Sequence, residues 1–211
     1  MSTSSKEEQT REVKADELQR FRSVLGRVIE VAETADIPYL VAGSAASNVW
    51  GRPTAIGDID LVVKPTDARR LLKAFEDADF DSQEAEPSWL FKATTEGVTV
   101  DIIFEMEGDL YVDDDMVDKG QYLEFEDTKL RMMGPEDYIV SQAMSTKEDT
   151  PDYWYNALGV LGRTELDWDY LVRRATAGPK RVLSLLIYAQ ANDLMIPNDA
   201  IARLYDDVYR R

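Results

Sequence analysis

The spacing of apolar residues divides the chain into two parts with different periodicities. Up to about residue 133, apolar residues recur every three or four positions in some segments, as on one face of a helix, and every second position in others, as on one face of a strand. After Gly134-Pro135 only the helical spacing recurs, and Pro, Gly or Asn separates the segments. We therefore predict a mixed α and β part over residues 15–133 and a helical part over residues 134–211. Residues 1–14 are polar and are predicted to form a disordered tail.

Individual elements follow from these periodicities and from the turn residues between them. In the first part, helices are predicted over residues 15–35, 44–51 and 65–79. Strands are predicted over residues 39–43, 58–64, 88–105 and 121–133, the last two as pairs of strands that turn at Glu96-Gly97 and at Glu126-Asp127. In the second part, five helices are predicted, over residues 135–147, 151–163, 166–177, 179–193 and 198–211.

Composition limits the chemistry that the protein can perform. The 211 residues include no Cys and no His. This excludes disulfides, zinc sites built on Cys or His, and catalysis by a Cys or His nucleophile or base. Any reaction must therefore use carboxylates, hydroxyls, Lys, Arg or a bound metal ion. With 44% hydrophobic residues, the chain is long enough to bury a sizeable core.

The formal net charge of −17 argues against a broad nucleic-acid-binding surface, because contacts to phosphates require clustered Lys and Arg. The simplest interpretation of this acidity is solubility, for example in a high-salt cytoplasm. No apolar run approaches the roughly 18 residues of a membrane span, and the first residues lack the apolar core of a signal peptide. We expect a cytoplasmic protein without a membrane partner.

Two aspartates begin one predicted strand and a third lies within a later one. Asp58 and Asp60 are two positions apart, so their side chains project from the same face of the strand. Two carboxylates about 4 Å apart repel by roughly 4 kcal/mol at an effective dielectric constant near 20. A hard divalent cation offsets that repulsion, and Asp101 is the expected third ligand. We predict a site for Mg²⁺, with Mn²⁺ as an alternative. The competing interpretation is that Asp58 and Asp60 end a turn and that Asp101 lies at a strand edge.

A small-residue turn precedes the aspartate pair. Gly43-Ser44 lies where a predicted strand passes into a short helix, so its backbone N–H groups are suited to hold an anion at the helix N-terminus. Followed by an aspartate pair on the next strand, this turn is predicted to hold a nucleotide phosphate. Ser44 is not a hydrolase nucleophile, because no His activates it and no Gly-x-Ser-x-Gly motif is present.

This combination resembles the nucleotidyltransferase superfamily, which is related in fold to DNA polymerase β. The signature of that superfamily is a Gly-Ser or Gly-Gly turn, a short helix, an aspartate pair on the following strand and a third carboxylate on a later strand. Gly43-Ser44, the pair Asp58 and Asp60, and Asp101 match it. The stretch "GRPTAIGDIDLVV" is similar to "GRPRATKDIDLLV" in small prokaryotic members of the toxin–antitoxin and aminoglycoside-modifying kind, and the similarity spans roughly residues 37–155.

The resemblance implies an α/β (α+β) core with a mixed sheet and flanking helices, followed by a helical C-terminal region, with the active cleft between them. It also implies Mg²⁺-dependent transfer of a nucleoside monophosphate from an NTP, such as ATP, to an acceptor hydroxyl, with release of pyrophosphate. The catalytic and metal-binding residues implied are Asp58, Asp60 and Asp101, and Asp101 is expected to take the acceptor's proton. The nucleotide-binding residues implied are Gly43, Ser44, Arg52 and Lys147. Arg52 has a surface loop residue as its competing interpretation, and Lys147 a solvated helix end.

Three functions stay open at this point. The first is an enzyme that modifies a small molecule, and the second is a toxin that modifies tRNA or protein and has an antitoxin as its partner. The third is a nucleotide-binding regulator that keeps the fold without turnover. The intact set of three carboxylates disfavours the regulator, and the negative charge disfavours tRNA. The acceptor, the preferred NTP and the oligomeric state do not follow from the sequence.

Overall fold

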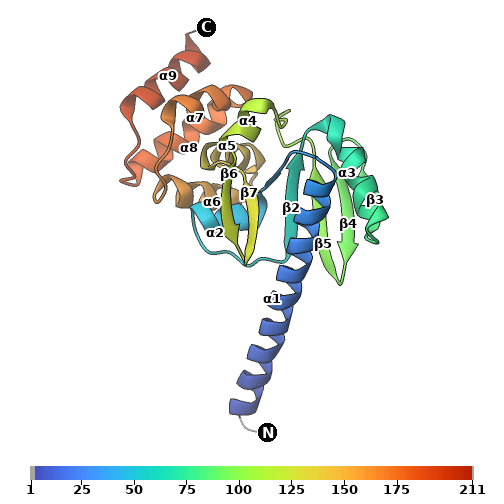
Figure 1. Ribbon diagram of the computed structural model, residues 1–211. Helices are drawn as coiled ribbons and strands as arrows, with labels where there is room; N and C mark the ends of the chain where they lie inside the picture. The colour runs from blue at the N-terminus through green and yellow to red at the C-terminus, as the bar shows by residue number, and fades with distance from the viewer. Residues whose placement is uncertain (1–2, 211) are drawn as a thin grey trace.

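The computed structural model describes the backbone of residues 3–210 and the side chains of residues 15–210. One seven-stranded sheet forms the centre of the first part of the chain, and helices pack around it (Figure 1). After β7 the chain is helical to its end. The predicted fold class, a mixed sheet with flanking helices followed by a helical region, is confirmed. The division into a core domain over residues 15–133 and a helical C-terminal region over residues 134–211 stays a prediction.

The sheet combines parallel and antiparallel pairs in the order β3-β4-β5-β2-β1-β7-β6. β2 runs parallel to β5, and β1 runs parallel to β7, while the other neighbours are antiparallel. The strands are β1 (Tyr39–Val41), β2 (Asp58–Val63), β3 (Asp81–Glu86), β4 (Leu90–Thr95), β5 (Val98–Ile103), β6 (Gln121–Phe125) and β7 (Thr128–Met132). β2 and β5 therefore lie side by side near the middle of the sheet, where backbone hydrogen bonds hold both edges of each strand.

Two helices cover one face of the sheet. α1 (Thr3–Thr34) contacts β5, β7 and α3 (Pro65–Asp77), and α3 contacts β3, β4 and β5. The contact is apolar, because both helices repeat apolar residues on the side that faces the strands. The fully buried side chains on these helices include Val24, Val28, Ala32, Leu71 and Phe75. α2 (Gly43–Trp50) packs elsewhere, against β2 and the C-terminal helices.

The C-terminal helices pack around one central helix. α5 (Pro135–Ser145) is buried from Pro135 to Met144 and contacts α2, α6, α7 and α8. Through α2 it connects the C-terminal helices to the sheet. The helices in contact with α5 at this end are α6 (Asp152–Leu161), α7 (Trp168–Arg174) and α8 (Pro179–Ala191), and α9 (Asn198–Tyr209) packs against α7 and α8. A short 3-10 turn lies at Ala175–Ala177. Within residues 3–210, no helix is long and apolar enough to cross a membrane.

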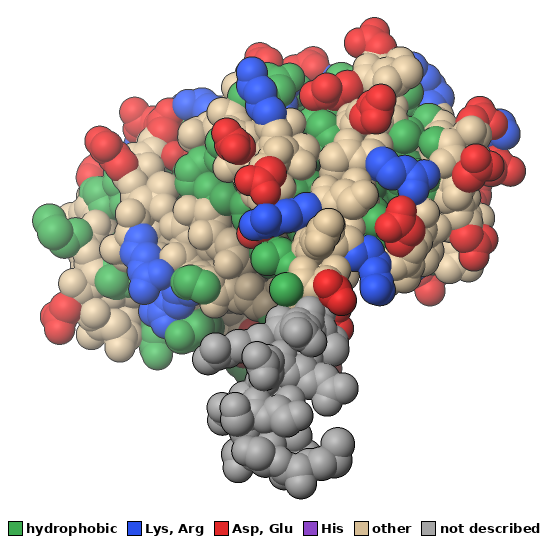
Figure 2. Space-filling model, turned by 60° about the horizontal axis from the view of Figure 1, so that its bottom comes forward, with side chains coloured by type: hydrophobic (Ala, Val, Ile, Leu, Met, Phe, Trp, Pro, Cys, Tyr) green, Lys and Arg blue, Asp and Glu red, His purple; other side chains and the backbone are tan. Residues whose placement is uncertain are grey.

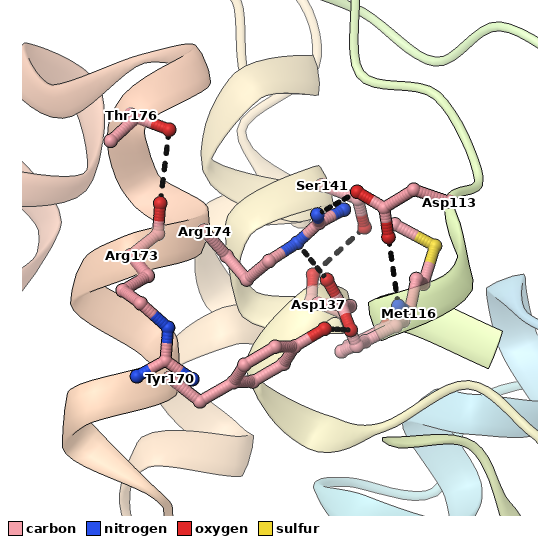
Figure 3. A network of polar contacts seen from close by, with 9 residues as sticks. Asp113, Met116, Asp137, Ser141, Tyr170, Arg173, Arg174 and Thr176 are labelled. Carbon is pink, nitrogen blue, oxygen red and sulfur yellow. Dashed lines mark hydrogen bonds and ion pairs between the residues drawn. The ribbon is translucent and has the colours of Figure 1, made fainter. Parts of the chain in front are cut away.

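A network of charged groups centred on the buried Asp137 joins α5 and α7 to the loop that ends at Asp113 (Figure 3). Asp137 of α5 accepts hydrogen bonds from Arg174 Nε and from the Tyr170 hydroxyl of α7, each at 2.7 Å. Arg174 also pairs with Asp113, which caps α4 (Asp114–Lys119) by accepting from the N–H of Met116. Burial raises the pKa of Asp137, while Arg174 and Tyr170 oppose that shift. The carboxylate is thus compensated by both partners.

The structure differs from the sequence prediction at three elements. β3 and α4 were not predicted: β3 is a polar edge strand that pairs only with β4, and α4 has six residues, too few to show a helical period. α1 begins at Thr3 rather than near Ala15. Residues 3–14 are rich in Lys, Glu, Gln and Arg, which favour helix without an apolar face. Residues 3–14, predicted as part of a disordered tail, are therefore helical, and residues 1–2 lie outside the described residues.

Candidate active site

The three aspartates lie close together on two neighbouring strands. β2 and β5 pair in parallel with Asp60 opposite Asp101 and Asp58 opposite Thr99. Residues opposite one another in a sheet share a face, so all three carboxylates project from the same side. One carboxylate oxygen of each lies within 4.8 Å of those of the other two. Asp58 is exposed, and Asp60 and Asp101 are partly buried.

The alternation of the two strands explains why the carboxylates point away from the helices. In β2, Ile59 and Leu61 are buried, and Asp60 between them is only partly buried. In β5, Val100 and Ile102 are buried on either side of Asp101. The apolar side chains gain from burial under α1 and α3, and the period of two then places the aspartates on the opposite face. Hydrophobic burial thereby fixes the orientation of the charged groups.

The cluster carries more negative charge than its surroundings neutralise. The pKa of Asp60 is raised to about 7, first by burial and then by the neighbouring charges of Asp58 and Asp101. The ammonium of Lys92 and the N–H of Ser44, which donates a hydrogen bond to Asp60, act against this shift. The shift shows that the metal-free cluster disfavours full ionisation. A bound cation would relieve that cost.

Lys92 belongs to this cluster and was missed in the sequence analysis. It lies on β4 opposite Asp101, and its Nζ is 2.7 Å from Asp101 Oδ1. The turn predicted at Glu96-Gly97 was sufficient to place Lys92 opposite Asp101. Glu96-Gly97 forms the turn with positive φ at both positions, as a two-residue hairpin of type I′ requires. Such a turn pairs Thr95 with Val98, and counting back along both strands pairs Lys92 with Asp101.

The Gly43-Ser44 turn lies directly against Asp60. Gly43 has φ of +54°, and a Cβ at this position would be 1.7 Å from Asp60 Oδ2. Gly43 therefore allows the backbone to approach the carboxylate, a role in addition to the predicted contact with a nucleotide phosphate. Among the described residues, the buried Ser44 Oγ has no hydrogen-bond partner. A buried hydroxyl without a partner beside the aspartates is suited to receive a ligand atom.

Arg52 lies on the loop between α2 and β2 and rests on α6. Its guanidinium carbon is 3.9 Å from the centre of the Tyr155 ring. A Cβ on Gly159 would lie 2.8 Å from Arg52 Cγ, so this glycine makes room for the side chain. The Nε of Arg52 is buried and has no hydrogen-bond partner among the described residues. Arg52 thus packs on the Tyr155 ring, and its Nε–H is a hydrogen-bond donor without an acceptor among the described residues.

Several hydrogen bonds hold the loop before Asp58 against α2. Asn48 of α2 donates to the carbonyls of Ser44 and Thr54, and the N–H of Thr54 donates to Asn48 Oδ1. Ser47 Oγ donates to the carbonyl of Arg52. These bonds join the Gly-Ser turn to the segment that leads into the aspartate pair. The spacing of the two motifs in the sequence therefore corresponds to a physical connection.

Lys147 is placed differently from the other predicted site residues. It follows α5, and its Nζ is 3.4 Å from Glu107 Oε1. Its backbone exchanges hydrogen bonds with Thr150, and within residues 15–210 its ammonium forms an ion pair with Glu107 and with none of the three aspartates. Its predicted contact with nucleotide phosphates stays a prediction.

The residues present fit a hard divalent cation. Three carboxylates within reach of one another supply only oxygen ligands, the type that Mg²⁺ and Mn²⁺ prefer. The raised pKa of Asp60 shows that the charge is under-compensated without such an ion. The Gly43 cradle and the partnerless Ser44 hydroxyl lie beside the same carboxylate. The donor set and the turn thus form one site.

The chain resembles a known family in sequence and several solved proteins in structure. A family model described as "Nucleotidyl transferase of unknown function (DUF2204)" matches residues 21–182. Comparison with curated proteins gave no match. Among solved structures, ANT(2")-Ia in complex with adenylyl-2"-tobramycin is similar at 15% identity and a TM-score of 0.45, with 82% of this chain and 98% of that chain covered. The lincosamide antibiotic adenylyltransferase LnuA, bound to lincomycin, is similar at 13% identity and a TM-score of 0.45, with 64% and 95% covered.

Proposed function

The chain belongs to the nucleotidyl transferase family whose model matches residues 21–182, and we propose that it transfers a nucleoside monophosphate from an NTP to an acceptor hydroxyl. The observation that carries this proposal is the set Asp58, Asp60 and Asp101, each with a carboxylate oxygen within 4.8 Å of the others. In the proposed site these three residues hold Mg²⁺, or Mn²⁺ in its place. When bound, the ion supplies positive charge that stabilises the phosphates of the nucleotide and the leaving pyrophosphate.

The residues of the chain have distinct proposed roles in the reaction. The acceptor oxygen forms a bond to the α-phosphorus, the bond between that phosphorus and the bridging oxygen breaks, and pyrophosphate leaves with the electron pair. Asp101 takes the proton of the acceptor hydroxyl, because the chain has no His for this task. Ser44 donates its hydroxyl to a phosphate oxygen, and Arg52 offers its buried Nε–H to the triphosphate.

We propose a small molecule rather than tRNA as the acceptor. The support is the net charge of −17, together with the face in Figure 2, where Lys and Arg side chains are scattered among Asp and Glu side chains. A tRNA-modifying toxin requires clustered basic groups that follow the phosphate backbone. An antitoxin partner belongs to that alternative and is therefore not part of the proposal.

A transfer assay tests the function and the acceptor class together. The purified protein would be incubated with Mg²⁺, cell extract and each of four NTPs labelled in the α-phosphate, and products would be separated by size and identified by mass spectrometry. We expect one NTP to label a small-molecule fraction, with equimolar release of pyrophosphate. Label in tRNA or protein would support the toxin alternative. If no fraction is labelled although an NTP binds, the regulator without turnover is the correct function.

A further inference from the structure

A single basic side chain extends the row of aspartates across the sheet. Lys92 of β4, Asp101 of β5 and Asp60 of β2 occupy directly opposite positions on three adjacent strands, whose order is visible in Figure 1. Within residues 15–210, Lys92 is the only Lys or Arg that forms an ion pair with one of the three aspartates. The other basic groups near the turn, such as Arg52, point to different partners.

The position of Lys92 leaves the cluster both anionic and accessible. Its Nζ donates a hydrogen bond to one oxygen of Asp101, Oδ1, at 2.7 Å, and among the described residues it donates none to the second oxygen of that carboxylate. Three carboxylates and one ammonium leave an excess of negative charge. The side chains of Lys92 and Asp101 are 33% and 16% exposed, so their charges are less screened than those of a surface pair.

A fixed positive charge at this position affects two ligands in opposite ways. A bare divalent cation that approaches the aspartates is repelled by the ammonium of Lys92. A complex of the same cation with an NTP carries a net negative charge, and the ammonium attracts it. Removing the charge therefore tightens the binding of one ligand and weakens the binding of the other.

We propose that Lys92 is a positioning and selectivity residue that suppresses binding of the bare cation and favours binding of the metal–nucleotide complex. The inference rests on the proposed function, because it assumes that the aspartates bind a cation together with an NTP. It assigns to Lys92 a role through charge. A role in which Lys92 merely holds Asp101 in place predicts instead that both affinities fall together when the ion pair is lost.

The test compares two binding measurements on the full-length protein. Binding of Mn²⁺ alone would be followed by electron paramagnetic resonance, and binding of each of four Mg–NTP complexes by calorimetry. For Lys92→Met we expect Mn²⁺ to bind roughly tenfold more tightly, the change produced by removing one unit charge about 6 Å from a divalent ion in water. The best Mg–NTP complex should bind at least about fivefold more weakly, because the loss has the same electrostatic origin.

Three further variants separate charge from structure. Lys92→Arg keeps the charge and should resemble the wild type in both measurements, while Lys92→Gln keeps a hydrogen-bond donor and should resemble Lys92→Met. Lys73→Met removes an equal charge from the surface of α3, where Lys73 pairs with Glu76 and Asp77. This control should change neither affinity. Melting temperatures of all four variants would identify any that are poorly folded.

The possible failures point to different conclusions. If both affinities of Lys92→Gln fall, or if neither changes, the inference about Lys92 is overturned. If the wild type binds Mn²⁺ but no Mg–NTP complex, the proposed function fails, and the Mn²⁺ measurement still decides whether Lys92 repels the bare cation.

Discussion

The protein contains two clusters of carboxylates that are neutralised to very different degrees. Asp137 is fully buried, and Arg174 and Tyr170 each bind one of its oxygens. Asp60 is partly buried, yet two other carboxylates lie beside it and Lys92 pairs with only one of the three. In the first cluster the fold supplies partners for the buried charge. In the second it leaves the charge in excess.

This difference separates a structural role from a functional one. A buried charge with its partners in place stabilises the arrangement of α5 and α7, and it would be costly to break. A partly buried charge without sufficient partners lowers stability, and a bound cation would remove that cost. The comparison makes opposite predictions for the removal of charge from the two clusters.

The largest expected effect is on turnover at the aspartate cluster. Asp58→Asn with Asp60→Asn should lower the rate of nucleotide transfer by at least about a thousandfold, equivalent to ~4 kcal/mol of transition-state stabilisation. The melting temperature without metal should stay the same or rise, because repulsion is removed. A clear drop in that melting temperature would mean that these carboxylates form structural hydrogen bonds, against this account.

Removal of the Arg174 charge from the Asp137 cluster should instead destabilise the fold. Arg174→Met leaves Asp137 buried without its cation, which should lower the free energy of unfolding by about 3–5 kcal/mol. Denaturant unfolding measures this loss. The double variant Asp137→Asn with Arg174→Met should recover part of it, because no charge is then left unpaired. An effect below about 1 kcal/mol for Arg174→Met would show that the network contributes little.

The pH dependence of stability distinguishes the clusters through Asp60. Its pKa is raised to about 7 in the folded protein, so the folded state binds this proton more tightly than the unfolded state does. Its contribution to stability therefore falls as the pH rises towards 7 and is constant above. Between pH 5 and pH 8, with chelator present, Asp60→Asn should gain about 2–3 kcal/mol of stability relative to the wild type. Parallel pH profiles for the two proteins would contradict the raised pKa.

The smallest expected effect compares two serines of α2. The buried Ser44 Oγ has no partner among the described residues, whereas Ser47 Oγ donates to the carbonyl of Arg52. Ser44→Ala should weaken NTP binding by roughly 1–2 kcal/mol and leave the melting temperature unchanged. Ser47→Ala should lower stability by about 1 kcal/mol with a smaller effect on NTP binding. Equal NTP affinities for Ser44→Ala and the wild type would remove Ser44 from the site.

The aspartate cluster was predictable because its geometry follows from local periodicity. Asp58 and Asp60 share a face by the period of two, and the hairpin turn fixes which residue lies opposite Asp101. Sequence reasoning found the three aspartates and the turn beside them. It overlooked Lys92, although the register of the hairpin contained the information.

Other features depend on contacts that no local pattern encodes. The bonds between Asp137 and the pair Tyr170 and Arg174 join residues more than thirty positions apart in the chain, and nothing in either segment indicates the partner. The strand β3 is polar except for Ala85 and exists because β4 offers a free edge for backbone hydrogen bonds. The close approach of Gly43 to Asp60 likewise appears only when β1, which ends two residues before Gly43, is paired with β2.

The central claim is that the under-neutralised aspartates bind a divalent cation together with an NTP, and calorimetry tests it directly. Each of the four NTPs would be titrated into the wild type with Mg²⁺ and again with chelator, at pH 8, where Asp60 is ionised. We expect at least one NTP to bind with Mg²⁺ and to lose at least about tenfold in affinity with chelator, equivalent to 1.4 kcal/mol. If no NTP binds, or if the best one binds equally well with chelator present, the aspartates do not form the proposed site.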